Sequence, residues 1–272
     1  MGDARGHVAA VVATALLAVH CGGANSGAAD AGTIVLLAYG GAPGEVAADV
    51  AAVEPGAGQA ATCATPLGAG SCRLCQLAGA LDILLGGYGN FGPISVSVGT
   101  TTVPLTYAGI GYGTVDFPSS IALGTGGIMT FRGGNGAGVP IFDVSAIIPG
   151  LAVVTSPAPA VDGGALAVDT SQDLSVTWVP ITIGQIQLVL SVGLSVQGAS
   201  IACTFDGAGG SGTVPHGLLS TLKAMSMPDA GPAYVSLSSQ NEATTVIDGL
   251  TIVTESYQDS PTSGRAVTVT LR

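Results

Sequence analysis

The sequence predicts an all-β protein made of two sandwich-like units with one short helix. Three observations support this fold class. Forty-three glycines and fifteen prolines in 272 residues imply many turns and little helix. Residues 173–205 contain three successive β-type runs, the first of which alternates apolar and polar side chains as a half-buried strand does. The single tryptophan, Trp178, lies on the apolar side of the first run, 25 residues before Cys203 on the third, which indicates the middle of a sandwich core.

The N-terminus predicts export. Residues 8–19 form an apolar run of 12 after a short polar start that contains Arg5. A helix of that length rises about 18 Å, too short for a span of about 30 Å, so residues 1–20 are interpreted as a signal peptide. The run ends next to Cys21, as in bacterial lipoprotein signals, and we expect a lipid anchor on this cysteine. Ordinary secretion is the alternative, because His20 stands where a small residue is usual.

Residues 21–59 are rich in Gly, Ala, Ser and Asp and are interpreted as a flexible tether. Residues 33–39 are the exception, because their apolar character predicts a strand that joins the body of the protein. Residues 45–53 are Ala-rich, and a short helix is expected there.

Four cysteines remain after Cys21, and an even number in an exported chain predicts disulfides. They are Cys63, Cys72, Cys75 and Cys203. Three of them lie close together in the chain, so at least one bridge is expected to be local, while Cys203 either joins this group or stays a buried thiol. The Cys72-x-x-Cys75 spacing lacks the βαβ context of a redox motif, and no metal site is predicted.

The rest of the chain divides into an N-terminal β unit with a Cys-rich loop, residues 60–156, and a C-terminal sandwich of the immunoglobulin-like type, residues 157–272. The boundary falls in the Pro- and Gly-rich stretch 156–164. Strands are expected at 94–98, 101–107, 114–117, 128–131, 141–147, 151–155, 174–179, 185–190, 200–205, 234–238, 244–247, 250–254 and 266–271. Residues 216–225 are the clear helix candidate, with Leu218, Leu219 and Leu222 on one face.

Aromatic residues gather in the loops of the first unit, although they make up only 4% of the chain. Flat exposed rings can stack on sugar faces, so these residues are candidates for a ligand face, with core packing as the alternative. They are Tyr88, Phe91, Tyr107, Tyr112 and Phe117.

Five short stretches stand out: GSCRLC at 70–75, the segment 126–142, DLSVTW at 173–178, IACTF at 201–205 and GTVP at 212–215. Together they resemble a group of uncharacterised exported lipoproteins of the myxobacterial type. The resemblance covers roughly residues 60–225. It implies an exported location and a β-rich build, and it brings no catalytic residues.

Composition excludes several chemistries. A net charge of −11 argues against nucleic acid as a partner. After the signal peptide only His216 remains, and the chain has no Gly-x-Ser-x-Gly, so neither a Ser-His-Asp hydrolase nor a multi-histidine zinc enzyme is expected. The candidates for an acid pair in glycoside hydrolysis, or for a calcium site, are aspartates in Asp-Gly turns, which turn chemistry alone explains: Asp162, Asp206 and Asp248.

These observations predict a non-enzymatic cell-envelope protein with a structural or surface-binding role, without catalytic residues, metal or cofactor. We expect it at the outer membrane or cell surface, held to the membrane by a lipid anchor on Cys21, with secretion or a periplasmic location as the alternative. Surface polysaccharide or another envelope protein are the expected partners. Two alternatives remain: a carbohydrate-binding or adhesin-type module, and a glycan-directed hydrolase that uses an Asp pair.

Overall fold

The computed structural model describes residues 33–42, 45–53, 61–64, 71–77, 91–107, 112–134, 139–157, 165–192, 198–226, 233–259 and 267–272. Within these ranges the protein is mostly β, with the helix α3 (His216–Met225) and the short 3-10 helix η1 (Gly207–Gly209). The strands are β1 (Thr33–Gly40), β2 (Ala47–Val53), β3 (Ala61–Ala64), β4 (Cys72–Leu77), β5 (Ile94–Val98), β6 (Thr101–Leu105), β7 (Val115–Asp116), β8 (Ile128–Gly133), β9 (Phe142–Ile147), β10 (Val154–Ser156), β11 (Leu166–Val168), β12 (Leu174–Trp178), β13 (Gln185–Val192), β14 (Ala199–Asp206), β15 (Ser211–Val214), β16 (Ala233–Ile247), β17 (Leu250–Asp259) and β18 (Val267–Leu271).

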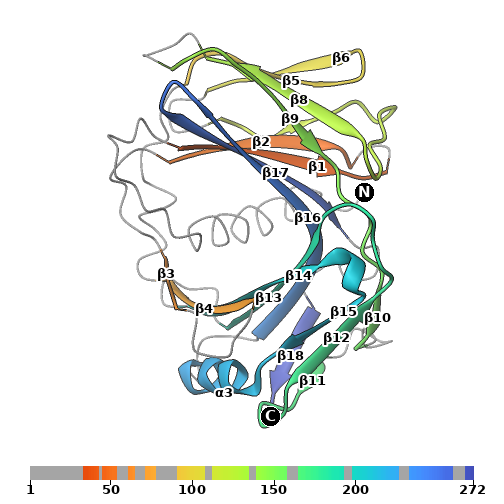
Figure 1. Cartoon of the computed structure of the whole chain (residues 1–272), viewed down its shortest axis with the longest axis vertical. Helices are drawn as coiled ribbons and strands as arrows, with labels where there is room; N and C mark the ends of the chain where they lie inside the picture. The colour runs from red at the N-terminus through yellow and green to blue at the C-terminus, as the bar shows by residue number, and fades with distance from the viewer. Residues whose placement is uncertain are drawn as a thin grey trace.

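One large, curved sheet runs through the molecule in the order β3-β4-β14-β13-β16-β17-β1-β2-β7, with β18 joining β16 to β11 (Figure 1). The 15-residue strand β16 lies in the middle of this order. Its first half pairs with β13, and its second half pairs with β17 in a hairpin. That hairpin turns at Asp248 and Gly249, whose φ values of 49° and 84° are those of a type I′ turn. β16 therefore pairs with strands from both ends of the large sheet and joins the two ends.

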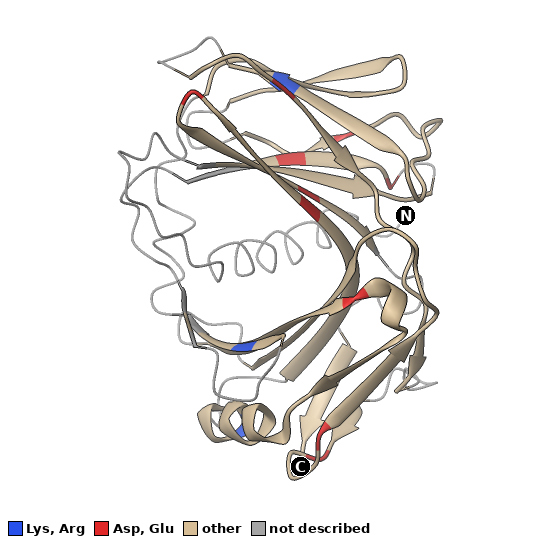
Figure 2. Cartoon of the chain, in the orientation of Figure 1, with Lys and Arg blue, Asp and Glu red and all other residues tan. Residues whose placement is uncertain are grey.

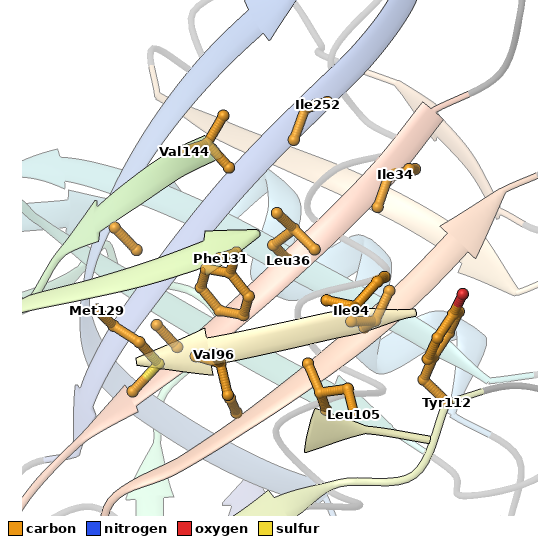
Figure 3. Close-up of a cluster of buried hydrophobic side chains, with 14 of the residues drawn as sticks. Ile34, Leu36, Ile94, Val96, Leu105, Tyr112, Met129, Phe131, Val144 and Ile252 are labelled. Atoms are coloured by element: carbon orange, nitrogen blue, oxygen red, sulfur yellow. The ribbon is translucent and has the colours of Figure 1, made fainter. Parts of the chain in front are cut away.

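A hydrophobic core, the first cluster, fills the space between the β1–β2–β17 end of this sheet and the four-stranded sheet β6-β5-β8-β9 (Figures 1 and 3). Strict alternation brings the same side of each strand inward, as in β9, where every second residue is buried. Leu36, Phe131 and Ile252 meet in this layer. The two sheets are also linked at Ser256, whose hydroxyl donates to the Ile147 carbonyl at 2.6 Å.

A second cluster lies at the other end of the large sheet. There β13 and β14 pack against the three-stranded sheet β10-β12-β15 and against α3. Trp178 is buried, as predicted, and its ring stacks on Phe205 with 5.8 Å between centroids. Its indole N–H donates to the Gly207 carbonyl at 2.9 Å, so the one polar atom of the side chain is satisfied.

The described residues confirm the predicted β-rich class, the 33–39 strand as β1, and the helix at 216–225 as α3. The expected Ala-rich helix at 45–53 is wrong. Residues 47–53 form β2, which pairs with β1 and places Ala48 and Val50 in the first cluster. Residues 1–20 and most of 21–59 outside β1 and β2 lie beyond the described ranges.

The two clusters group the chain differently from its order in sequence. β17 supplies Leu250 and Ile252 to the first cluster, which otherwise comes from residues before 150. β4 supplies Cys72 to the second. Each cluster therefore uses strands from both sides of the predicted boundary at 156–157, and the division into independently folding domains stays a prediction.

Candidate functional site

All four predicted disulfide cysteines are paired. Cys63 bonds Cys75 and Cys72 bonds Cys203, so one bridge is local and Cys203 joins the group. Each pair occupies directly opposed positions, the first across β3 and β4 and the second across β4 and β14. Because side chains alternate along a strand, Cys72 and Cys75 lie on opposite faces of β4, and the two bridges fasten opposite faces of the sheet edge. Disulfides persist in oxidising compartments, so the pair of bridges indicates an extracytoplasmic protein.

The predicted ligand-face aromatics are largely core residues. Phe91, Tyr112 and Phe117 are buried in the first cluster. Tyr107 is half-buried and meets Tyr112 edge-on, with 5.4 Å between ring centroids. The Tyr112 hydroxyl donates to the Gly92 carbonyl at 2.6 Å and accepts from the Phe91 N–H at 2.9 Å, which fixes the loop before β5. These rings fill the interior and do not form an exposed stacking surface. Tyr88 and Cys21 lie outside the described residues.

The described aspartates of the Asp-Gly pairs have local structural roles in a cap and a turn. Asp206 accepts a hydrogen bond from the Ala208 N–H at 3.1 Å and caps η1. Asp248 occupies the left-handed region in the β16–β17 hairpin. Asp162 lies outside the described residues. The two described aspartates therefore act as turn residues, as turn chemistry predicts.

His216 pairs with Asp173 at the start of α3. Asp173 Oδ1 accepts from the His216 backbone N–H at 2.7 Å and lies 2.8 Å from Nδ1 of its ring. These two hydrogen bonds lower the pKa of Asp173. Both side chains are more than half exposed. The Ser220 hydroxyl, one turn along the helix, donates to the Gly217 carbonyl. The arrangement is that of a helix cap, in which a carboxylate satisfies a free N–H and ties α3 to β12.

A buried acidic residue that sequence reasoning missed lies on β17. Leu250 and Ile252 point into the first cluster, so by alternation Val253, Glu255 and Tyr257 point the other way. Glu255 is only 3% exposed. We use "the Glu255 face" for the side of β1, β16 and β17 that carries Tyr39, Glu242, Glu255 and Tyr257. The signal for it is the sequence Val-Thr-Glu-Ser-Tyr, which puts an acid at an apolar position of a strand.

Two rings and a second acid surround Glu255. The Tyr257 hydroxyl donates to Glu255 Oε2. The Tyr257 ring stacks on Tyr39 of the neighbouring strand β1, with 5.8 Å between centroids and 22° between planes. Glu242 of β16 stands directly opposite Glu255. Burial, opposed by the Tyr257 hydrogen bond and aided by the charge of Glu242, raises the pKa of Glu255 to about 7. This carboxyl can therefore take up or release a proton near neutral pH.

The Glu255 face also has unmet hydrogen-bonding capacity. Glu255 Oε1 is buried and has no partner among the described residues. Asp49 of β2 also lies on the Glu255 face, but both of its carboxylate oxygens have partners. Its Oδ1 accepts from the Val50 N–H and its Oδ2 accepts from the Thr114 hydroxyl, both at 2.7 Å. Both oxygens of Asp49 therefore have a partner, whereas one oxygen of Glu255 has none among the described residues.

No family model matches the chain, and no curated protein does. Several distant solved structures resemble the chain, among them one from CNTN1 and one from titin. The FN1–FN3 domains of chicken CNTN1 are 11% identical, with coverage of 71% of this chain and 72% of that one and a TM-score of 0.23. A titin A168–A169 structure is 9% identical, with coverage of 85% and 97% and a TM-score of 0.18. Within the described residues no helix is both long and apolar enough to cross a membrane.

Proposed function

We propose that this chain is an exported, lipid-anchored protein of the cell envelope with a non-enzymatic structural or binding role. The pairing of all four cysteines downstream of Cys21 carries the proposal, because disulfides need the oxidising surroundings that a signal peptide leads to. The membrane partner is reached through the lipid on Cys21, and surface polysaccharide or another envelope protein is the partner beyond it. The outer membrane or cell surface is the proposed location.

The finer architecture proposed here is a pair of immunoglobulin-like sandwiches that share the large sheet. Support comes from two buried clusters, each between two β layers, and from the stacked Trp178 and Phe205 inside the second. Such sandwiches present their loops at the two ends of each unit, which suits a protein that holds or contacts other molecules.

A non-enzymatic role agrees with how the polar residues are used. His216 and Asp173 cap a helix, and Asp206 and Asp248 support turns, so the side chains a hydrolase would need are engaged in local structure. The acid-pair hydrolase considered from the sequence therefore has no support at these aspartates.

The test is intact mass spectrometry of the native protein from its own membrane fraction, before and after reduction. We expect loss of residues 1–20, a lipid mass on Cys21, and on reduction a gain of one hydrogen per cysteine sulfur at Cys63, Cys72, Cys75 and Cys203. A Cys21→Ala variant is the control and should move to the soluble fraction. A soluble native protein with an unmodified Cys21 would contradict the lipid anchor and favour a secreted or periplasmic protein. Four free thiols would contradict export.

A further inference from the structure

Two glutamates face each other across the centre of the large sheet. Glu242 on β16 and Glu255 on β17 are direct antiparallel partners, so both side chains project from the Glu255 face. The Cβ atoms of such partners lie about 4.5–5.5 Å apart, and like charges in this position destabilise a sheet. The repulsion is relieved either by a proton on one carboxyl or by a positive charge bound between the two.

The described chain supplies no such charge nearby. No Lys or Arg occurs in β1, β2, β13, β16 or β17. The described basic residues lie elsewhere: Arg73 on β4, Arg132 on β8, Lys223 on α3 and Arg272 at the C-terminus. Arg132 is already paired with Asp143 at 2.8 Å. Figure 2 shows the acidic colour where β16 and β17 lie side by side, and no basic colour on either strand.

One glutamate of the pair is buried and the other is exposed. Glu255 is buried, and its Oε1 lacks a partner among the described residues. Glu242 is exposed, as is Thr244 two residues along the same face of β16. A ligand therefore meets Glu242 first, and the unpartnered oxygen of Glu255 is the deeper acceptor. The Tyr257 hydroxyl donates to the other oxygen of this carboxyl, Oε2, and the Tyr257 ring stacks on Tyr39.

We propose that Glu242 and Glu255, with the Tyr39–Tyr257 ring pair, bind the ammonium group of a small aliphatic amine. An ammonium group donates three hydrogen bonds, and carboxylate oxygens accept them at the short distances typical of charge-assisted bonds. Aromatic rings within about 6 Å of a cation attract it through their π faces. Gln240 lies next along the face from Glu242 and opposite Tyr257, which adds a polar amide side chain to the same face.

A metal ion fits this place less well. Calcium takes roughly six to eight oxygen ligands, and magnesium needs near-octahedral geometry. No group of three or more His, Cys, Asp or Glu side chains suited to a metal occurs among the described residues. Two carboxyls beside two aromatic rings match an organic cation better.

Binding is coupled to a proton. A cation favours the ionised form of Glu255, whose pKa of about 7 leaves it largely protonated at pH 6. Amine binding at pH 6 should therefore release a proton from this carboxyl, and affinity should rise between pH 6 and pH 8. A ligand held only by surface attraction to the net charge of −11 would release no proton from a buried group.

The experiment is isothermal titration calorimetry of the full-length protein with 1,4-diaminobutane and spermidine, and with 1,4-butanediol as the uncharged isostere. Titrations at pH 6 in buffers of different ionisation enthalpy measure the released proton. Glu255→Gln and Glu242→Gln are the test variants. Glu45→Gln is the matched control, since it removes the same charge from an exposed loop position. Circular dichroism checks that each variant is folded.

We expect saturable amine binding that is weakened at least about tenfold in both test variants, or by about 1.4 kcal/mol, and is unchanged in Glu45→Gln. Proton release should disappear in Glu255→Gln, and 1,4-butanediol should not bind. The proposal is overturned if folded wild-type protein shows no saturable binding up to about 10 mM amine. It is also overturned if binding survives Glu255→Gln, or if calcium binds with the same dependence on both glutamates.

Discussion

Glu255 shows at the scale of one residue how burial changes chemistry. An unfolded chain would ionise this carboxyl near pH 4.5, whereas in the folded protein its pKa is about 7. The folded state therefore binds a proton more tightly than the unfolded state does. Stability from this group is fully present below pH 4.5 and is lost as the pH rises towards 7.

Glu255→Gln should remove that pH dependence. The glutamine carbonyl can still accept the Tyr257 hydrogen bond, but no charge forms on raising the pH. The shift corresponds to about 3 kcal/mol, so the variant should be more stable than wild type by up to that amount at pH 8 and nearly equal to it at pH 4. Urea unfolding followed by circular dichroism at both pH values measures this. Equal destabilisation at both would show that packing, and not ionisation, dominates at this position.

Trp178 is the second residue with a testable role. It combines ring packing against Phe205 with a hydrogen bond to Gly207. Trp178→Phe removes this hydrogen bond and part of the ring, although the Gly207 carbonyl still accepts from the Ile181 N–H, so we expect a loss of about 2 kcal/mol in the free energy of unfolding. Val179→Ala, at the next and 50% exposed position, should stay within about 0.5 kcal/mol. Chemical denaturation of both variants tests the contrast, and equal losses would contradict it.

At the scale of elements, the sequence predicts a helix or strand correctly where several of its signals agree. α3 matched its predicted bounds because Pro215 precedes it and three leucines share one face. β2 was missed because alanine favours helices when isolated, and the pairing with β1 decides its structure. β3 and β4 were missed because clustered cysteines suggest a loop. β16 was predicted as two strands because its middle, Gln240 to Ala243, is polar where it passes between the two clusters.

The candidate site was missed for a related reason. Asp-Gly pairs mark turns in the sequence, and Asp206 and Asp248 do lie in turns. Glu255 stands in a strand, and only the pairing of β17 with β16 brings Glu242 opposite it. No local pattern predicts that register, because it depends on a turn and on two hydrophobic clusters at once.

The β16–β17 hairpin makes its own prediction. Gly249 has a φ of 84°, which a β-branched residue adopts only with strain. Gly249→Val should therefore lower stability by about 1–2 kcal/mol. Gly217→Ala is the control, because a Cβ there meets no atom within 4 Å and alanine favours a helix. Thermal unfolding should show a lower midpoint for the first variant and an equal or higher one for the second. A similar decrease in both would argue against the turn as the cause.

At the scale of the whole molecule, two clusters depend on one sheet, and the disulfides fasten only its β3–β4–β14 edge. In the chain-entropy account, the stabilisation grows with the separation of the bonded residues, which is 131 for Cys72–Cys203 and 12 for Cys63–Cys75. The long bridge should constrain the unfolded chain far more than the short one.

Paired substitutions compare the two bridges. Replacing Cys72 and Cys203 by alanine should cost about 5 kcal/mol, and replacing Cys63 and Cys75 about 3 kcal/mol. Guanidinium unfolding of the two double variants measures the difference, and the second variant serves as the control for loss of any bridge in this region. A larger loss from the short bridge would show that local packing outweighs chain entropy.

The parallel pairing of β1 with β17 bears on mechanical load. β1 begins at Thr33, is the first described strand after the proposed anchor, and is held against β17 from Thr33 opposite Thr251 to Gly40 opposite Gln258. β2 holds its other edge. A pull from the membrane would act along this strand, so its hydrogen bonds would resist together in shear and would not open one after another. With the proposed anchor in place, this pairing would let the protein bear tension without unravelling from its N-terminal end.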